Sequence, residues 1–346
     1  YLRTRIFKVK RQFETLPVTI IICARNEAHN ISLCLKTLIL QDYPMDLVEL
    51  ILVNDASTDR TLQEAELVLH HSRLPYRIIS NKEKKGKKES ITLAMRLARD
   101  GMIILRDADT FAPSKNWLRA LAGFYQQSHP DLIIAPVVFD KADGLLAALQ
   151  QTENSLLQMV TAGSAFYQVP FLCNGANLAF SKKTFDRVGG FNSSLHLEGG
   201  DDIFFLEDVK KLPDVRIVYL KAPEALIETY PARTFKQLLR QRVRWASKFK
   251  YNRNKLNLFS ATLIGLVNLL WLFWCVMSIA GGAHCVNALM LVSFKLVIDL
   301  LLLFLSQANT KNKSSVMYTL PVALLYPFYA CTVAFVSVFE KPRWKK

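Results

Sequence analysis

The chain has 346 residues, a formal net charge of +15 and a hydrophobic content of 51%. This length allows one large domain with a smaller appended region. Positive charge gathers near the N-terminus and just before the hydrophobic tail, where the positive-inside rule accounts for it. No aromatic-basic RNA or DNA motif accompanies it, so nucleic acid is excluded as the partner. The six cysteines form no CxxC pair, which excludes a zinc framework and a disulfide scaffold and fits a reducing compartment.

The charge distribution and hydropathy predict four parts. Residues 256–346 contain only seven basic and two acidic residues, which is typical of a membrane region. The chain starts at Tyr1 rather than Met, so we expect residues 1–16 to be a basic connector from a missing N-terminal segment. The expected parts are this connector, an α/β domain at 17–233, an amphipathic interfacial helix at 234–255, and a transmembrane region of about three hydrophobic segments at 256–346.

Short apolar runs alternate with helical patterns through the first part of the domain. Strands are predicted at 18–23, 49–53, 76–80 and 102–105, and helices at 30–41, 58–70 and 88–99. This alternation predicts a doubly wound sheet with parallel strands. In such sheets ligands bind beyond the carboxyl ends of the strands, where this chain places Arg25-Asn26-Glu27, Asn54-Asp55 and Asp107-Ala108-Asp109.

The second half of the domain is less regular. Strands are predicted at 131–139, 177–180 and 215–220, and a helix at 145–160. Residues 234–250 then form an amphipathic basic pattern typical of a helix in the membrane interface. The broad apolar side of this pattern consists of Phe235, Leu238, Leu239, Val243 and Phe249.

The tail contains apolar stretches at 258–280, 285–305 and 316–339. The first two are long enough to span a bilayer, with a tight turn expected at Gly281-Gly282 between them. Lys295 and Asp299 are four residues apart and are expected to pair on one helix face. The third stretch contains Pro321 and Pro327, which predict a kink or partial insertion. Three full spans would also leave the basic end 341–346 outside, so an interfacial or re-entrant third stretch is expected.

Two carboxylates directly follow the run at 102–105. Asp107 and Asp109 are two residues apart, a spacing that presents oxygens to one hard cation such as Mg or Mn. Such a cation bridges two phosphates and neutralises charge on a departing nucleotide. The alternative is a solvated turn with local capping.

Two further features near the strand ends have a functional and a plain interpretation. Asp55 is placed to accept hydrogen bonds from a base or ribose, or else to form an N-cap or Asx turn. The basic run 84–88 is either a loop that meets phosphates in front of a helix N-terminus or a solvated surface loop.

Two motifs lie further along the chain. Gly199-Gly200-Asp201-Asp202 pairs two carboxylates, an arrangement that raises one pKa and suits a general base; the alternative is a surface turn. In the segment 241–245, Arg244 is suited to hold a diphosphate and Trp245 to stack on a sugar. An interfacial anchor is the plain alternative. The polar turn 173–177 gives only a weak signal.

Taken in order, these motifs resemble those of the family 2 glycosyltransferases with the GT-A fold. The most similar members are the membrane-integrated enzymes related to cellulose, hyaluronan, chitin and poly-N-acetylglucosamine synthases. The resemblance covers about residues 17–250 and rests on the order of seven short motifs. These are Ala24-Arg25-Asn26-Glu27, Asn54-Asp55, Gly86-Lys87, Asp107-Ala108-Asp109, Asn174-Gly175-Ala176-Asn177, Gly200-Asp201-Asp202 and Gln241-x-x-Arg244-Trp245.

The resemblance implies a role for each matching residue. Asp55 would contact the nucleotide base, with Glu27 nearby, and Lys87 would help to hold the donor. Asp107 and Asp109 would bind the diphosphate through Mg or Mn. Asp202 would be the catalytic base, and Asp201 beside it would belong to the substrate-binding site. Position 201 is Asp where many relatives have Glu. Gln241, Arg244 and Trp245 match the Q-x-x-R-W motif, which is associated mainly with processive polymer synthesis.

The resemblance therefore implies a GT-A type doubly wound mixed sheet, followed by an interfacial helix and C-terminal transmembrane helices. The implied activity is inverting sugar transfer from a nucleotide-sugar donor, with UDP-linked donors the first expectation, to a glycan or lipid acceptor. The implied location is the cell (inner) membrane, multi-pass, with the catalytic domain cytoplasmic. The tail has fewer hydrophobic segments than the large channel-forming synthases have.

Two other classes of function remain open at this point. A nucleotidyltransferase that acts on a sugar phosphate also uses a doubly wound sheet, carboxylates and Mg, but needs no membrane tail. A non-catalytic membrane scaffold with a transferase-like domain has no need for intact acidic motifs. Donor hydrolysis or transfer in detergent with Mn or Mg distinguishes an enzyme from a scaffold.

Overall fold

The computed structural model describes residues 7–8, 15–197, 199–247, 255–281, 285–307 and 317–339. Most of the expected connector at 1–16, Phe249 of the amphipathic pattern, Gly282 and the basic end 341–346 lie outside these residues. The chain forms two compact units. The sheet unit comprises the residues up to Val138 together with Val160–Tyr230, and the helical unit comprises Phe139–Met159 and the described residues from Pro231 on.

The sheet unit is built on a seven-stranded mixed sheet with the strand order β3-β2-β1-β4-β8-β6-β9. The strands are β1 (Val18–Ala24), β2 (Val48–Asn54), β3 (Tyr76–Ser80), β4 (Met102–Asp107), β6 (Leu132–Ile134), β8 (Asn177–Ser181) and β9 (Ile217–Tyr219). Strands β3, β2, β1 and β4 are parallel, whereas β8 is antiparallel to both β4 and β6. The predicted mixed α/β sheet is therefore confirmed.

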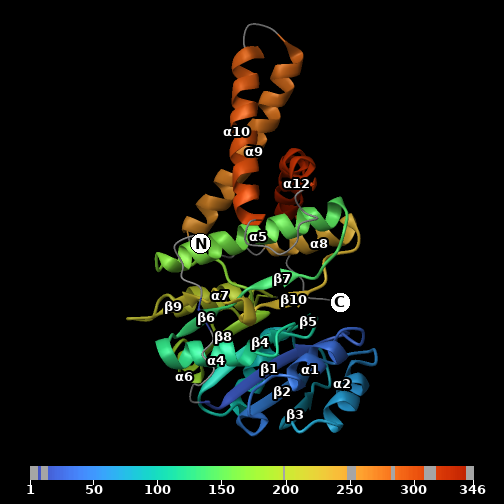
Figure 1. Ribbon diagram of the computed structural model, residues 1–346, viewed down its shortest axis with the longest axis vertical. Coiled ribbons are helices and arrows are strands. Elements are labelled where there is room, and N and C mark those ends of the chain that lie inside the picture. The colour runs from blue at the N-terminus through green and yellow to red at the C-terminus, as the bar shows by residue number, and fades with distance from the viewer. Residues whose placement is uncertain are drawn as a thin grey trace. The chain divides into compact units, whose positions relative to one another are not determined.

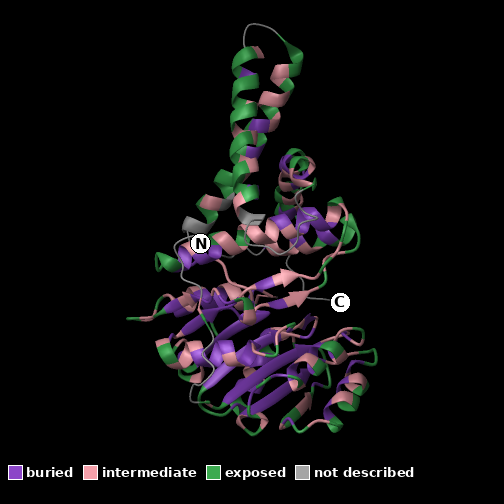
Figure 2. Cartoon of the chain, viewed as in Figure 1, coloured by how far each residue is buried: buried purple, intermediate pink, exposed green. Residues whose placement is uncertain are grey.

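Helices cover both faces of this sheet (Figure 1). Because successive strand residues point to opposite faces, Ile20 and Ile22 of β1 enter one core and Ile21 enters the other. The first core includes residues of α1 (Ile31–Ile39), α2 (Thr61–His70) and α4 (Trp117–Ser128). The second includes residues of α3 (Lys87–Leu97), α6 (Lys182–Arg187) and α7 (Asp201–Val209). The central strands are almost wholly buried, as Figure 2 shows.

The single strand predicted at 131–139 is wrong, because the chain forms two strands there. Strand β6 ends at Ile134, and β7 (Val137–Phe139) belongs to a separate three-stranded sheet with the order β5-β10-β7. Pro136 lies between them, and proline has no N–H to continue a ladder. The other two strands are β5 (Thr110–Phe111) and β10 (Ile227–Thr229), and short 3-10 helices span Met45–Leu47 and Pro223–Ala225.

The strand register gathers several predicted residues at one edge of the large sheet. Ala24 of β1 lies opposite Asn54 of β2, and Cys23 lies opposite Asp107 of β4. Strand β8 runs the other way, so its first residue, Asn177, lies opposite Arg106 near the end of β4. The antiparallel direction of β8 thus brings the turn before Asn177 to the same edge as the carboxyl ends of the parallel strands.

The helical unit contains the first part of α5 (Leu145–Phe166), α8 (Phe235–Ala246), α9 (Lys255–Ala280), α10 (Cys285–Gln307) and α12 (Thr319–Phe339). The last three are long and apolar enough to cross a membrane. Helices α9 and α10 lie side by side, and most of their surface is exposed (Figures 1 and 2). The C-terminal helices that the sequence predicted are present.

Helix α8 packs on other helices of the same unit. Leu238 is fully buried against Ala148 and Leu149 of α5 and against Val322 and Tyr329 of α12. Of the apolar side predicted for this helix, Leu238 and Val243 are buried, whereas 51% of Phe235 is exposed. The buried face of α8 therefore meets protein within the helical unit.

Two sequence features of the tail have a definite structure. The expected pair between Lys295 and Asp299 is present, and Lys295 also donates to Asn268 Oδ1 at 3.1 Å. Helix α12 runs from Thr319 to Phe339 and continues through Pro327. Pro321 falls in the first turn of this helix, where a missing N–H costs no hydrogen bond.

Candidate active site

The Asp107–Asp109 segment forms a braced turn at the end of β4. Thr110 Oγ1 donates to the backbone oxygen of Asp107 at 2.7 Å. The buried guanidinium of Arg106 donates from Nη2 to the backbone oxygen of Thr110 at 3.0 Å and from Nε to Thr110 Oγ1 at 3.2 Å. Because Arg106 and Asp107 are consecutive on a strand, their side chains leave opposite faces of the sheet. Arg106 thus supports the turn from the face opposite to Asp107.

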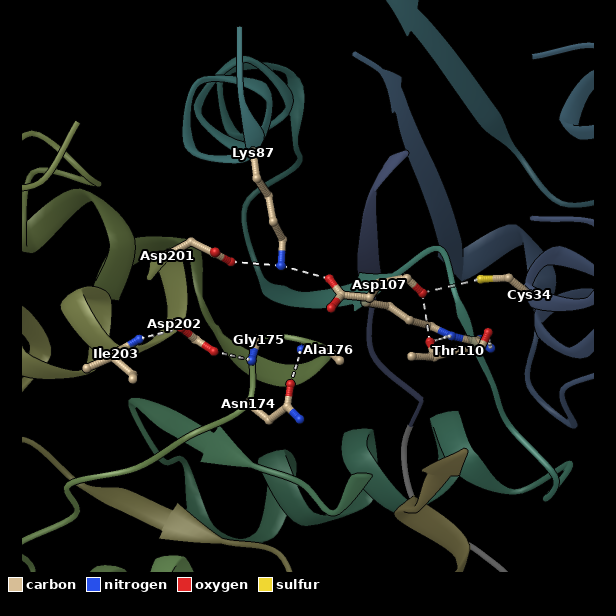
Figure 3. A network of polar contacts seen from close by, with 11 residues as sticks. Cys34, Lys87, Asp107, Thr110, Asn174, Gly175, Ala176, Asp201, Asp202 and Ile203 are labelled. Atoms are coloured by element: carbon tan, nitrogen blue, oxygen red, sulfur yellow. Dashed lines mark hydrogen bonds and ion pairs between the residues drawn. The ribbon is translucent and has the colours of Figure 1, made fainter. Parts of the chain in front are cut away.

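Lys87 links two acidic segments that are far apart in sequence. It is the first residue of α3, and its Nζ lies 2.7 Å from Asp107 Oδ1 and 2.8 Å from Asp201 Oδ2 (Figure 3). The exposed fractions of the side chains are 14% for Lys87, 8% for Asp201 and 34% for Asp107. Burial disfavours the ammonium form, but the two carboxylates outweigh it and raise the pKa of Lys87 well above its ordinary value.

Asp107 lies close to two other carboxylates. Burial raises its pKa, Lys87 opposes this effect, and the carboxylates of Asp109 and Asp201 add to it. Asp107 and Asp201 therefore share the ammonium of Lys87, and Asp109 adds negative charge close to Asp107, an arrangement that favours a bound cation.

Asp201 and Asp202 open α7 after Gly200, which adopts a left-handed conformation with φ of 69°. Their side chains have different partners. Whereas Asp201 meets Lys87, Asp202 Oδ2 accepts from the backbone N–H of Gly175 at 3.2 Å, and its Oδ1 accepts from the N–H of Ile203 at 2.8 Å (Figure 3). Asp202 is therefore oriented by backbone donors and is not ion-paired to Lys87.

The turn that holds Asp202 was the weakest of the sequence signals. Gly175 lies against the acidic pair: a Cβ at this position would stand 3.1 Å from Asp201 Oδ2 and 3.2 Å from the Asp202 Cβ. Asn177 is fully buried and supports the same turn. Its Oδ1 accepts from Trp117 Nε1 at 3.2 Å, and its Nδ2 donates to the backbone oxygens of Pro136 and Ala225. No local pattern points to these contacts, because they join distant segments.

Asp55 is fully buried beneath the basic loop. Its Oδ1 accepts from Asn81 Nδ2 at 2.8 Å and from the N–H of Lys85 at 2.8 Å, and its Oδ2 accepts from the N–H of Gly86 at 3.0 Å. Asp55 thus fixes the loop that leads into α3, and so helps to place Lys87 at the head of that helix.

Glu27 lies in the turn after β1 and is buried. Its Oε2 accepts from Asn30 Nδ2 at 2.7 Å, and its N–H donates to Thr61 Oγ1 at 2.7 Å. The neighbouring Arg25 donates from Nη1 to the backbone oxygens of Asp55 and Ala56 at 2.6 and 2.7 Å, joining the turns that follow β1 and β2. The sequence had assigned Arg25 no role of its own.

The backbone is locally strained in both of these turns. Asn26 has a φ of 55° and Ala56 a φ of 52°. A left-handed conformation is uncommon for alanine, and such conformations cluster at active sites and ligand clamps. These two left-handed residues follow β1 and β2, at the same edge of the sheet as the acidic residues, which supports this edge as the candidate active site.

The residues at the end of β4 fit a divalent cation that the substrate helps to hold. Among the residues that the structure describes, no three His, Cys, Asp or Glu side chains form a metal cluster by themselves. Mg²⁺ characteristically binds through one or two carboxylates plus substrate phosphates, keeping several waters. Asp107 and Asp109, whose carboxylates lie close enough to raise the pKa of Asp107, match that donor set.

The Q-x-x-R-W residues lie on α8 of the helical unit. Gln241 Oε1 accepts from Arg242 Nη1 at 2.6 Å, and the Arg242 guanidinium lies 4.3 Å from the centroid of the Trp245 ring. Arg242 in turn pairs with Glu153 of α5. Neither Arg242 nor Glu153 had been assigned a role from the sequence.

Residues 19–189 match the protein family described as Glycosyl transferase family 2. Glycosyltransferase AglE from Haloferax volcanii is 26% identical over 232 residues, which cover 66% of this chain and 72% of AglE. The probable glycosyltransferase YdaM from Bacillus subtilis is 25% identical over 255 residues, which cover 70% of this chain and 58% of YdaM.

A solved structure supports the fold. The mannosyltransferase PcManGT from Pyrobaculum calidifontis, in complex with GDP-Man and Mn²⁺, superposes with a TM-score of 0.56 at 18% identity, covering 95% of this chain and 91% of PcManGT. The mixed sheet, with acidic residues gathered at one edge, is that of a GT-A enzyme. Residues 19–189 match the glycosyltransferase family 2 domain, and the chain is a glycosyltransferase.

Proposed function

We propose that the chain transfers a sugar from a UDP-linked donor, with inversion, to a glycan or lipid acceptor at the membrane. The observation that carries this proposal is the placement of Asp202. The N–H of Gly175 orients the Asp202 carboxylate. Asp202 lies beside the network of Lys87, Asp107 and Asp201 and is not ion-paired to Lys87. Such a carboxylate suits a general base next to a site for a charged leaving group.

The proposed step is a direct displacement at the anomeric carbon of the donor. Asp202 accepts the proton of the acceptor hydroxyl while the acceptor oxygen bonds to the anomeric carbon. The bond between that carbon and the diphosphate oxygen breaks, and the nucleoside diphosphate leaves with the electron pair. One displacement inverts the anomeric configuration, because the acceptor attacks opposite to the leaving group.

The other residues of the sheet unit would bind the donor. Asp107 and Asp109 would hold Mg or Mn with the diphosphate, and this cation would neutralise charge on the leaving group. The ammonium of Lys87 would add positive charge next to the same phosphates. The rule for open α/β sheets assigns Asp55 and Glu27, in the turns after β2 and β1, to the base and ribose. Because Asp55 is fully buried and accepts from the N–H groups of Lys85 and Gly86, its contact with the base would require this loop to move.

We assign acceptor binding to the helical unit. Arg244 and Trp245 would contact acceptor phosphate and sugar, with Gln241 beside them. The motivation for this assignment is the resemblance of these three residues to the Q-x-x-R-W motif of the membrane-integrated synthases. Because that motif is associated mainly with processive synthesis, we also propose that the acceptor can be a growing polymer. We further propose a catalytic domain at 17–233 on the cytoplasmic side of the cell membrane, followed by the helix at 234–255 and the multi-pass region at 256–346. Three helices of sufficient length and apolarity support membrane association.

A panel of labelled nucleotide sugars tests the proposal. Purified protein in detergent is incubated with UDP-N-acetylglucosamine, UDP-glucose or GDP-mannose, with membrane lipid extract and with Mn²⁺, Mg²⁺ or EDTA. We expect one UDP-sugar to yield a glycosylated product and free UDP only when the cation is present. A parallel reaction with UTP and a sugar 1-phosphate tests nucleotidyl transfer, which would release pyrophosphate. Retention of the donor's anomeric configuration would overturn the proposed displacement.

A further inference from the structure

Helix α5 has a single charged side chain along its 22 residues, and that side chain forms a largely buried ion pair. Glu153 Oε2 accepts from Arg242 Nε of α8 at 2.6 Å. The exposed fractions are 13% for Glu153 and 5% for Arg242. Burial raises the pKa of the Glu153 carboxyl above its ordinary value, and Arg242 opposes this effect. The pair therefore bears a desolvation cost.

That cost makes a purely stabilising role a poor explanation of the pair. Buried ion pairs often contribute less to stability than well-packed apolar residues of similar volume would. The neighbouring contact between the same two helices is already apolar, since Leu238 of α8 packs against Ala148 and Leu149 of α5. The ion pair between Glu153 and Arg242 beside this apolar contact is better explained by the side chains that the Arg242 guanidinium holds in place.

Two other partners of the Arg242 guanidinium lie in the Q-x-x-R-W segment, and Tyr329 of α12 also lies close to it. Arg242 Nη1 donates to Gln241 Oε1 at 2.6 Å, and Arg242 Cζ lies 4.3 Å from the centroid of the Trp245 ring. Residues three apart on a helix share a face, which allows the guanidinium to cover the indole. Glu153 therefore holds the Nε edge of the planar Arg242 guanidinium. The rest of that guanidinium contacts the side-chain amide of Gln241 and the indole of Trp245.

We propose that Glu153 and Arg242 are positioning residues for acceptor binding: their ion pair sets the orientation of Gln241 and Trp245. This inference rests on the proposed function, which assigns the acceptor to that segment. It extends the acceptor machinery to α5, a helix without any of the sequence motifs. The pair touches no residue assigned to the donor, so its loss should affect transfer to an acceptor and spare chemistry that needs the donor alone.

The test compares Glu153→Gln and Arg242→Lys with Arg240→Gln, which removes a charge from an exposed position of the same helix. Two rates are measured with UDP-N-acetylglucosamine, or with whichever sugar the panel selects: hydrolysis without acceptor, and transfer to membrane lipid extract. We expect both pair variants to lose about tenfold in transfer, the scale of a misplaced aromatic contact, and to hydrolyse donor within about twofold of wild type. Arg240→Gln should match wild type in both.

Two further measurements separate positioning from general damage. Acrylamide quenching of Trp245, taken as the difference between each protein and its Trp245→Phe counterpart, should change in the pair variants and not in Arg240→Gln. Adding Glu153→Gln to Trp245→Ala should lower transfer by less than it does alone, because Glu153 acts through Trp245.

The outcomes distinguish this inference from the function on which it rests. Normal transfer and quenching in the pair variants, with active wild type, overturns only the inference. Equal losses of hydrolysis and transfer also overturn it, because the pair would then support the whole enzyme. Wild-type protein that turns over no nucleotide sugar overturns the proposed function and this inference together.

Discussion

Gly175 lies so close to Asp201 that a Cβ on the glycine would stand 3.1 Å from the carboxylate oxygen Oδ2. The same atom would lie 3.2 Å from the Asp202 Cβ and 3.5 Å from Lys87 Nζ. One glycine therefore packs against three of the residues that we assign to donor binding and catalysis. Its backbone N–H also donates to Asp202.

Gly175→Ala should lower transfer without unfolding the protein. The added methyl group must push Asp201 or Asp202 away by a few tenths of an ångström, and a displacement of that size at a reacting centre should cost about tenfold in turnover. Turnover and thermal stability are measured together. Gly265→Ala is the control, because a Cβ there meets no atom within 4 Å. Unchanged turnover in Gly175→Ala would show that this close packing is not needed for catalysis.

Lys87→Met should weaken donor binding and destabilise the sheet unit. The change leaves two carboxylates, Asp107 and Asp201, without their ammonium partner. Loss of one member of a buried ion pair is strongly destabilising, and because Asp107 is one-third exposed we expect about 2–3 kcal/mol. Chemical denaturation measures the stability, and calorimetry measures UDP affinity.

The matched control for Lys87→Met is Lys210→Met, which breaks the pair between Lys210 and Glu207 on the same unit. Lys210 pairs with one carboxylate in the next turn of its own helix, whereas Lys87 pairs with two, so the loss of Lys210 should change stability by less than about 1 kcal/mol. Equal stability changes in the two variants would contradict a special role for the Lys87 network.

Cys23 and Cys34 should resist alkylation in the folded protein. Burial raises the pKa of both thiols, so at pH 8 each has a smaller thiolate fraction than an ordinary cysteine, and the thiolate is the reactive form. Iodoacetamide labelling followed by peptide mass spectrometry should show both reacting at least about tenfold more slowly in the native protein than in guanidinium. Cys173, which is partly exposed, serves as the internal comparison. Rapid native labelling of Cys34 would be inconsistent with its place under the sheet.

The sequence predicted the parallel core well because its strands are continuous apolar runs. The runs at 18–23, 49–53 and 102–105 each became a strand buried along its length. The helix at 201–209 was not predicted, because its first turn carries two aspartates after two glycines, a pattern that also fits a surface turn. The predicted strand at 131–139 is divided at Pro136, which has no N–H for a strand ladder. The sequence shows this proline, but the apolar residues on both sides of it favoured one continuous strand.

The arrangement of the candidate site could be predicted only in part. The rule that ligands bind beyond the carboxyl ends of strands was sufficient to select Asp55, Asp107 and Asp109. The contact of Lys87 with Asp201 depends on the antiparallel insertion of β8 and on where α7 begins, and neither has a local signature. Arg242 and Glu153 went unassigned for the same reason, because a buried ion pair between two helices is a property of packing.

Asp202→Asn is the sharpest test of the mechanism. A sugar hydroxyl is a weak nucleophile at neutral pH, and transfer needs a base within hydrogen-bond reach. Asparagine keeps the shape of the side chain and can still accept from Gly175, but it accepts no proton. We expect nearly unchanged nucleotide-sugar affinity and turnover lower by roughly 100- to 10,000-fold, the usual contribution of a general base. Single-turnover rates at saturating donor measure the effect.

The comparison with Asp201→Asn decides which carboxylate is the base. That variant keeps an oxygen for Lys87 and loses only a charge, so we expect a loss of about tenfold or less, as for one weakened ion pair. Asp208→Asn, further along α7, controls for the substitution itself and should turn over normally. If Asp201→Asn is inactive and Asp202→Asn is not, the base is Asp201, and Lys87 must release it before each transfer. If both variants keep normal rates, the base lies elsewhere and the displacement proposed above fails. Of the carboxylates that we place in this network, Asp107 and Asp201 are ion-paired to Lys87, and Asp202 is the one that Gly175 orients.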